Sequence, residues 1–170
     1  MKNRLFIIIL SITLCLTFTA CSGSSQSDET VDLSTIDFEL IKEQLPDYVK
    51  EKDDEALKSV TSAGFKIEEN FEGSGEPLLF VAATTSDKDC TQQDLYVIAG
   101  KFFMYINDLA AQQNPDIALS SEESVGGLYK SIKCAARIAT DGEALYGLAV
   151  NVDLFSSEDE KNLIEIMNQQ

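Results

Sequence analysis

The stretch from Thr91 to Gln113 constrains the fold most, because it is a long helix pattern between two groups of strand patterns. Thr91 and Asp94 have the spacing of a capping box at a helix start, and Asn114-Pro115 marks the end. Apolar residues recur every three or four positions and predict a helix with one broad buried side. The residues of this stripe are Leu95, Ile98, Ala99, Phe102, Ile106, Leu109 and Ala110.

The remaining patterns predict an α+β fold. Residues 65–71 alternate as an exposed strand does, whereas Leu78–Thr84 is apolar on both sides and predicts a central strand. Further helices are expected over residues 34–50, with a kink or break near Gln44 or Leu45 caused by Pro46, over 53–63, with Gly64 as terminator, and from Ser157. The order α-α-β-β-α-β-β-α predicts a mainly antiparallel four-stranded sheet with its helices packed on one face.

Residues 128–139 and 143–154 are expected to form a hairpin around Asp141-Gly142. A two-residue turn would scatter the large apolar side chains over both faces. A three-residue loop with a bulge at Gly142 collects most of them on one face, and burial of one face fixes register, so we prefer this alternative. It places Ile138 opposite Ala144, Ala136 opposite Tyr146, Cys134 opposite Leu148 and Ile132 opposite Val150.

The first twenty residues differ from the rest of the chain. Lys2 and Arg4 precede an apolar run from Leu5 to Leu16, and small residues follow up to Ala20. This is the build of a secretory signal peptide, and the run is short for a membrane span. We therefore expect a signal peptide at residues 1–20, a polar, flexible tether at 21–33 and a single globular domain at 34–170.

Phe18-Thr19-Ala20-Cys21 resembles the lipobox of bacterial lipoproteins. The resemblance implies cleavage after Ala20 and diacylation of the Cys21 thiol, for example with palmitate, so that the chain is held on the extracytoplasmic face of a cell membrane. Phe18 departs from the leucine that this family more often carries there. In size, export signal and element order the chain is similar to small lipoproteins of Gram-positive bacteria whose function is unknown, and no functional residues transfer from this likeness.

Acidic residues dominate the composition. The whole chain carries a net charge of −16, and loss of Lys2 and Arg4 with the signal peptide makes it −18. A surface of this charge repels nucleic acid and anionic headgroups. It either serves solubility alone or attracts cations and basic peptides.

The absence of histidine from the sequence removes several kinds of chemistry. Ser-His-Asp and Cys-His catalysis and histidine-containing zinc sites all require this residue. An enzyme that uses carboxylates alone is the alternative to a protein without catalytic activity. We expect no enzyme and no cofactor.

Cys90 and Cys134 are the two cysteines that follow Cys21. Outside the cytosol an even pair favours a disulfide, and the alternative is two separate thiols in the core. A loop of this length would stabilise the fold by about 4 kcal/mol when closed.

Two groups of charged residues are weak candidates for binding sites. Asp87, Asp89 and Asp94 suggest a cation site but lack the glycine and glutamate of a calcium loop, so a polar loop before a capped helix explains them better. Lys133 and Arg137 fall on the outer face of the expected hairpin. There they either dock a partner or an anion, or take part in cross-strand ion pairs, for example Arg137 with Glu143.

The sequence therefore favours a non-enzymatic binding or interaction module, tethered outside the cytoplasm, whose ligand the sequence does not identify. Its partners would be the membrane, reached through the lipid anchor, and a protein outside the cytoplasm. The alternative is a sensor or binder of cations or cationic peptides.

Overall fold

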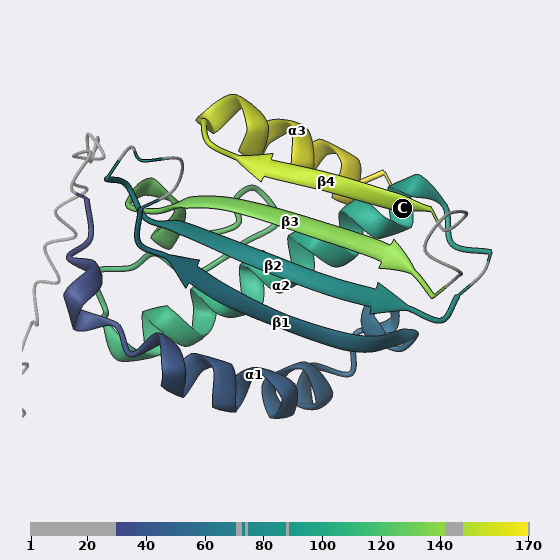
Figure 1. Cartoon of the computed structure of the whole chain (residues 1–170), viewed down its shortest axis with the longest axis horizontal. Coiled ribbons are helices and arrows are strands. Elements are labelled where there is room, and N and C mark those ends of the chain that lie inside the picture. The colour runs from purple at the N-terminus through teal and green to yellow at the C-terminus, as the bar shows by residue number, and fades with distance from the viewer. Residues whose placement is uncertain (1–29, 71–72, 74, 88, 142–147, 170) are drawn as a thin grey trace, which may run out of the picture.

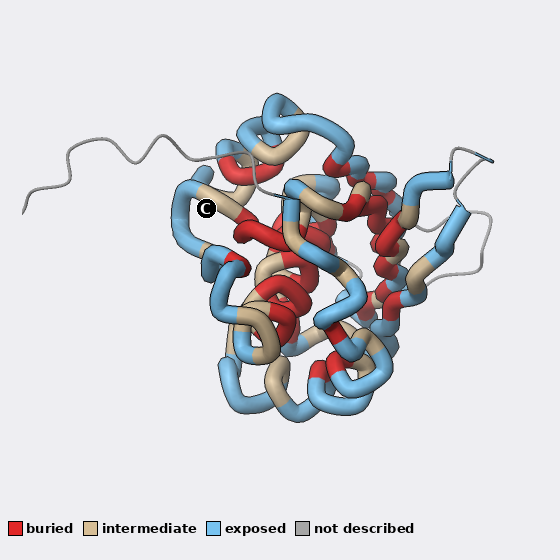
Figure 2. Tube along the Cα trace, turned by 90° about the vertical axis from the view of Figure 1, so that its left-hand side faces the viewer, coloured by how far each residue is buried: buried red, intermediate tan, exposed pale blue. Residues whose placement is uncertain are grey.

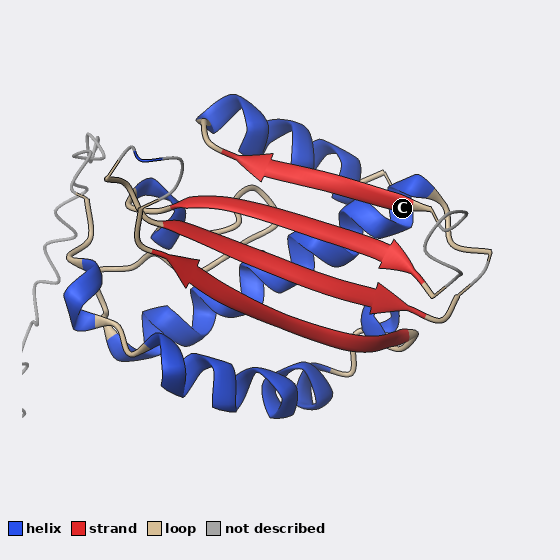
Figure 3. Ribbon diagram, in the orientation of Figure 1, coloured by secondary structure: helices blue, strands red, loops and turns tan. Residues whose placement is uncertain are grey.

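The computed structural model describes residues 30–70, 73, 75–87, 89–141 and 148–169. Within them three α-helices lie on one side of a four-stranded sheet (Figures 1 and 3). The helices are α1 (Phe38–Lys52), α2 (Gln92–Gln113) and α3 (Ser157–Met167). The strands are β1 (Val60–Glu68), β2 (Leu78–Thr85), β3 (Lys133–Thr140) and β4 (Ala149–Leu154). Short 3-10 turns occur at η1 (Leu33–Thr35), η2 (Glu55–Leu57) and η4 (Leu128–Lys130).

The strands lie in the order β1-β2-β3-β4. The pairs β1-β2 and β3-β4 are antiparallel, whereas the central pair β2-β3 is parallel. A parallel pair needs a long crossover connection, and α2 supplies it between Thr85 and Lys133. The α+β class and the four strands are confirmed, and the sheet has mixed orientation.

The core lies between α2 and the sheet. Figure 2 shows buried residues concentrated in this central helix and in the strands beside it. Thr91 caps α2 with the predicted capping box to Asp94, and the whole predicted stripe of α2 is buried. Strands β2, β3 and β4 each contribute buried residues to the core, for example Val81, Ala136 and Val152, whereas Phe65 is the one buried residue of β1. The central position predicted for the apolar strand β2 is confirmed.

The second helix predicted over residues 53–63 is wrong. After the single turn η2 the chain enters β1 at Val60, and Gly64 lies inside this strand opposite Ala82 instead of ending a helix. The acidic residues Asp53–Glu55 have the composition of a helix start. Asp54 does accept the N–H of Ala56, but it caps only the single turn η2. Pairing with β2 outweighs the local helix preference of the next residues.

The predicted register of the last two strands is also wrong. Cys134 lies opposite Leu154, Ala136 opposite Val152 and Ile138 opposite Val150. The strands are therefore joined by a longer connection than the turn at Asp141-Gly142. The rule that the apolar rows share one face still holds, since β4 alternates between buried and exposed positions. Residues 142–147 of the predicted hairpin lie outside the described part of the chain.

The long connection from α2 to β3 is fixed by the buried side chain of Asn107. Its amide group donates to the carbonyl oxygen of Ala118 at 3.0 Å and accepts the N–H of Leu128 at 2.9 Å. Gly126 packs directly against this amide with φ of +117°, a conformation that residues with a side chain rarely adopt. Asn107 thereby ties two parts of the connection to the middle of α2.

The folded contacts begin before residue 34, the expected start of the domain. The N–H of Val31 donates to the hydroxyl of Ser131, next to η4, and Asn114 donates to Thr35 at 2.9 Å. The chain thus joins the domain at the end where α2 and β1 finish and β3 begins (Figure 1).

Candidate functional site

A groove between α1 and β1 is the best-formed candidate site among the described residues. It encloses about 340 Å³, within the range of ligand pockets. We call it the α1–β1 groove. The residues that line it are Lys42, Leu45, Pro46, Val49, Leu57, Val60, Thr61, Ser62, Ala63, Gly64, Phe65 and Phe102.

The strand side of the groove is the free edge of β1. Six consecutive residues, from Val60 to Phe65, line the groove. Side chains of a strand alternate between the two faces of a sheet, so consecutive residues line one cavity only if it runs along the backbone edge. In the described chain β1 pairs with β2 alone, which leaves this edge without a strand partner.

The helix side of the groove is one face of α1. Lys42, Leu45, Pro46 and Val49 recur at helical spacing along it. The helix continues through Pro46, whose lack of an amide N–H removes the intrahelical bond to the carbonyl of Lys42. Of the kink or break predicted near Gln44 or Leu45, the break is wrong, because α1 is continuous through the proline. Ile41 and Leu45 pack into the core before the proline, and Tyr48 and Val49 pack against the core after it.

Among the described residues that line the groove, Lys42 alone is charged. Its ammonium group forms an ion pair with Glu39 and lies 5.7 Å from the ring centroid of Phe65. Phe38 meets the same ring edge to face, at a centroid distance of 6.5 Å. The lysine charge is thus already balanced by Glu39, and apart from Thr61 and Ser62 the other lining residues are nonpolar.

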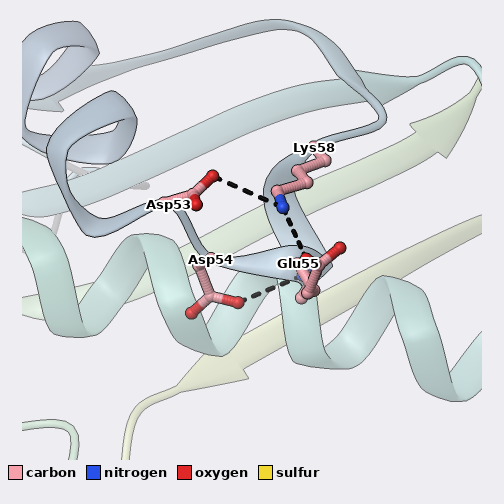
Figure 4. A network of polar contacts seen from close by, with 5 residues as sticks. Asp53, Asp54, Glu55 and Lys58 are labelled. Carbon is pink, nitrogen blue, oxygen red and sulfur yellow. Dashed lines mark hydrogen bonds and ion pairs between the residues drawn. The ribbon is translucent and has the colours of Figure 1, made fainter.

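A polar corner formed by Asp53, Asp54, Glu55 and Lys58 connects α1 to β1 (Figure 4). Asp53 ends α1 in the left-handed conformation, at φ of 47°. Lys58 pairs with Glu55 and, at 3.4 Å, with Asp53. These contacts set the position of η2, whose buried Leu57 forms part of the groove lining.

Asp54 anchors the same corner to α2. Its carboxylate lies 3.0 Å from the ammonium of Lys101 and accepts the hydroxyl hydrogen of Tyr105 at 2.9 Å. Partial burial favours the neutral acid, but the hydrogen bonds from Lys101 and Tyr105 outweigh it and hold the pKa of Asp54 below its usual value. Burial and the bond to Asp54 raise the pKa of Tyr105, so its hydroxyl stays protonated at neutral pH.

The substitution Asp54→Asn is expected to lower the free energy of unfolding by about 1–2 kcal/mol at pH 7, since it removes charged hydrogen bonds. A carboxylate with a lowered folded pKa stabilises the fold above its unfolded pKa, near 3.9, and the effect is lost as pH falls through the folded pKa. The loss should therefore shrink below pH 4. Urea denaturation between pH 2.5 and 7 measures it, with the exposed Asp153→Asn as control. A loss independent of pH would refute the assignment.

Lys133 and Arg137 do lie on the outer face of the sheet, as predicted, but they are not brought together. Lys133 pairs with Glu76 at 2.5 Å and lies 5.9 Å from the ring centroid of Phe155. Arg137 is exposed and donates to Asn151 on β4 at 3.4 Å. Glu143, the predicted ion-pair partner, lies outside the described residues.

Two of the three aspartates proposed as weak cation ligands, Asp87 and Asp94, accept local hydrogen bonds. Asp94 accepts the N–H and hydroxyl hydrogens of Thr91 in the capping box, and Asp87 accepts the N–H of Asp89 at 2.9 Å. Within the described ranges no group of three or more acidic or cysteine side chains is arranged to hold a metal ion.

The predicted disulfide between Cys90 and Cys134 is not formed. Both residues are buried free thiols, and burial raises the pKa of each. Cys134 lies opposite Leu79 at the start of β2, whereas Cys90 follows the other end of that strand. Six strand residues span about 20 Å. A disulfide requires Cα atoms within about 7 Å, so this topology keeps the cysteines apart.

Comparisons with known proteins leave the site to be interpreted from its own geometry. The chain matches no protein-family model, no curated protein and no solved structure. Among the helices of the described residues, none has the length and apolar character needed to cross a bilayer. Cys21, the predicted lipidation site, lies outside the described residues.

The α1–β1 groove was missed at the level of sequence. The one available signal was the run Thr61-Ser62-Ala63-Gly64, which is small and uncharged next to the acidic stretch Asp53–Glu55. Because these four side chains are small, they cannot fill the space between their own segment and the neighbouring helix α1.

Proposed function

We propose that this chain is a lipid-anchored binding module without catalytic activity, displayed on the extracytoplasmic face of a membrane, and that the α1–β1 groove is its ligand site. The observation that carries the proposal is an apolar groove of about 340 Å³ beside an unpaired strand edge. The resemblance of residues 18–21 to a lipobox supports the anchor. A binding role fits the lining, whose single charged group is already paired with Glu39.

The groove favours ligands with an apolar part. The residues that line it include the buried, apolar Leu57 and Phe102. Burial of apolar area contributes about 25 cal/mol per Å², so the groove would stabilise an apolar side chain or ring of matching size. The alternative function is the binding of cations or cationic peptides. Of these two ligand classes we favour cationic peptides, because Asp87 and Asp94 are engaged in local hydrogen bonds.

The uncharged fluorescent dye N-phenyl-1-naphthylamine tests the ligand site. Wild-type protein should bind the dye with a rise in fluorescence, and Ala63→Phe should weaken binding at least tenfold. Ala63 lies on the same face of β1 as Phe65, is exposed and lines the groove, so a phenyl ring there occupies the ligand space.

The matched control is Ala149→Phe, the same change at an exposed position of β4, the other edge strand. It should leave dye binding unchanged. Circular dichroism and urea denaturation confirm that both variants fold. Equal dye affinity in Ala63→Phe and wild type would place the binding elsewhere and refute the proposed site.

A further inference from the structure

We propose that the α1–β1 groove binds an extended peptide as a fifth strand on β1, with apolar side chains in the groove and basic residues at the ends of the peptide. The inference rests on the proposed function, because it names the ligand class of the same site. Three observations carry it: the course of the groove along the strand, the small residues of the edge, and the charge of the surrounding surface.

The course of the groove exposes the main chain of β1. Because Val60 to Phe65 all line it, backbone N–H and C=O groups on the free side of β1 face the groove. A strand edge between a sheet and a flanking helix is the arrangement in which proteins add a peptide strand, with main-chain hydrogen bonds giving affinity and pockets selecting alternate side chains.

The edge of β1 lacks the features that protect exposed strand edges. Natural proteins block such edges with charged residues, proline or bulges. Here the register irregularity lies at one end, between Val60 and Ser62, and the charged residues Lys66 and Glu68 lie at the other. Between them Ser62, Ala63 and Gly64 are small, and no heavy atom lies within 4 Å of the position that a Cβ on Gly64 would occupy. This segment is free to pair.

The charge of the surface selects a basic peptide. Glu43, Asp47 and Glu51 recur every four residues at exposed positions of α1, beside the row that lines the groove, and outnumber the one lysine on that side, Lys50. The chain as a whole is strongly negative, with a net charge of −16. Acidic peptides are repelled by this field, whereas lysine or arginine at the ends of a neutral, apolar segment is attracted.

The probe is a blocked octapeptide, Lys-Thr-Val-Thr-Leu-Thr-Val-Lys. Titration calorimetry should show binding that Ala63→Phe weakens at least tenfold and Ala149→Phe leaves unchanged. Hydrogen exchange should slow at least tenfold at alternate backbone amides of β1, because only every second N–H faces the free edge. Exchange on β4 should not change.

Two altered peptides separate main-chain pairing from charge. Methylation of alternate backbone nitrogens removes the donors on one edge of the peptide and should abolish binding. Replacement of both lysines by glutamate should weaken binding at least tenfold at low salt and less at high salt, because screening shortens the reach of surface charges.

Undiminished binding of the methylated peptide, or protection of β4 instead of β1, would overturn strand addition. Equal affinity for the glutamate peptide would overturn the charge preference. Dye binding sensitive to Ala63→Phe, without any peptide binding, would overturn this inference while the proposed function stands. Failure of both dye and peptide would remove the ligand site itself.

Discussion

Replacement of Gly126 by alanine is expected to lower the free energy of unfolding by about 3–5 kcal/mol. The new Cβ would lie 2.0 Å from the amide nitrogen of Asn107, at a backbone φ of +117° that alanine adopts only with strain. Asn107 is fully buried and cannot move without leaving the groups that it binds on Ala118 and Leu128 unsatisfied. Urea denaturation followed by circular dichroism measures the loss.

Gly64→Ala is the control for this prediction, because no heavy atom lies within 4 Å of the Cβ that the change would add, and the φ of Gly64 is not in the left-handed range. It should change stability by less than about 1 kcal/mol. The double variant Gly126→Ala with Asn107→Ala should lose less than the sum of the single losses, since the second change removes the clash. If Gly126→Ala costs no more than Gly64→Ala, the close packing described for the connection is wrong.

Replacement of Cys21 by serine is expected to abolish membrane attachment altogether. Under the proposed anchoring, the Cys21 thiol carries the acyl chains, and each buried methylene contributes about 0.8 kcal/mol, so two chains hold the protein firmly. In the native cell the wild type should take up radiolabelled palmitate and enter the detergent phase of a detergent–water partition. The serine variant should do neither.

Cys15→Ser is the matched control, because Cys15 lies within the apolar run of the proposed signal peptide and should be removed with it. This variant should keep both the label and the partition into detergent. A wild-type protein that takes up no palmitate and remains in the aqueous phase would refute the anchor, but would leave the groove and its dye-binding test unaffected.

Local signals predicted the elements whose stability is mainly local. The capping box of Thr91 and Asp94 and the stripe behind it gave α2 correctly, because both lie within one continuous helix. The last helix was also predicted, although its cap is Ser156 with Asp159, one residue earlier than expected. Glu160, which follows in the first turn of this helix, accepts the N–H of Val125.

The elements that depend on distant partners were not predicted. No local pattern in residues 60–64 indicates that they pair with β2. The helix predicted from the acidic start at Asp53 therefore included them. The direction of β3 relative to β2 is likewise set by the crossover through α2, and apolar alternation is the same for parallel and antiparallel neighbours. The register of β4 depends on the length of the connection from β3. The turn predicted at Asp141-Gly142 is shorter than the connection that the observed pairing requires.

The candidate site was the least predictable part for the same reason. The α1–β1 groove exists because α1 packs against α2 and leaves a gap at the edge of β1, and neither contact can be read from the sequence of either element. The charged residues singled out beforehand, Lys133 and Arg137, are instead distributed over the outer face of the sheet, where each has a partner.

The hydrogen bond of Val31 to Ser131 also limits how far the domain can travel. Under the proposed anchoring, the segment from Cys21 to Val31 spans at most about 35 Å when fully extended. The domain then stays within a thin layer above the bilayer, which raises its effective concentration toward a target fixed to the same membrane. Binding of such a neighbour would need only a modest intrinsic affinity, whereas a freely diffusing ligand with the same affinity would remain mostly unbound.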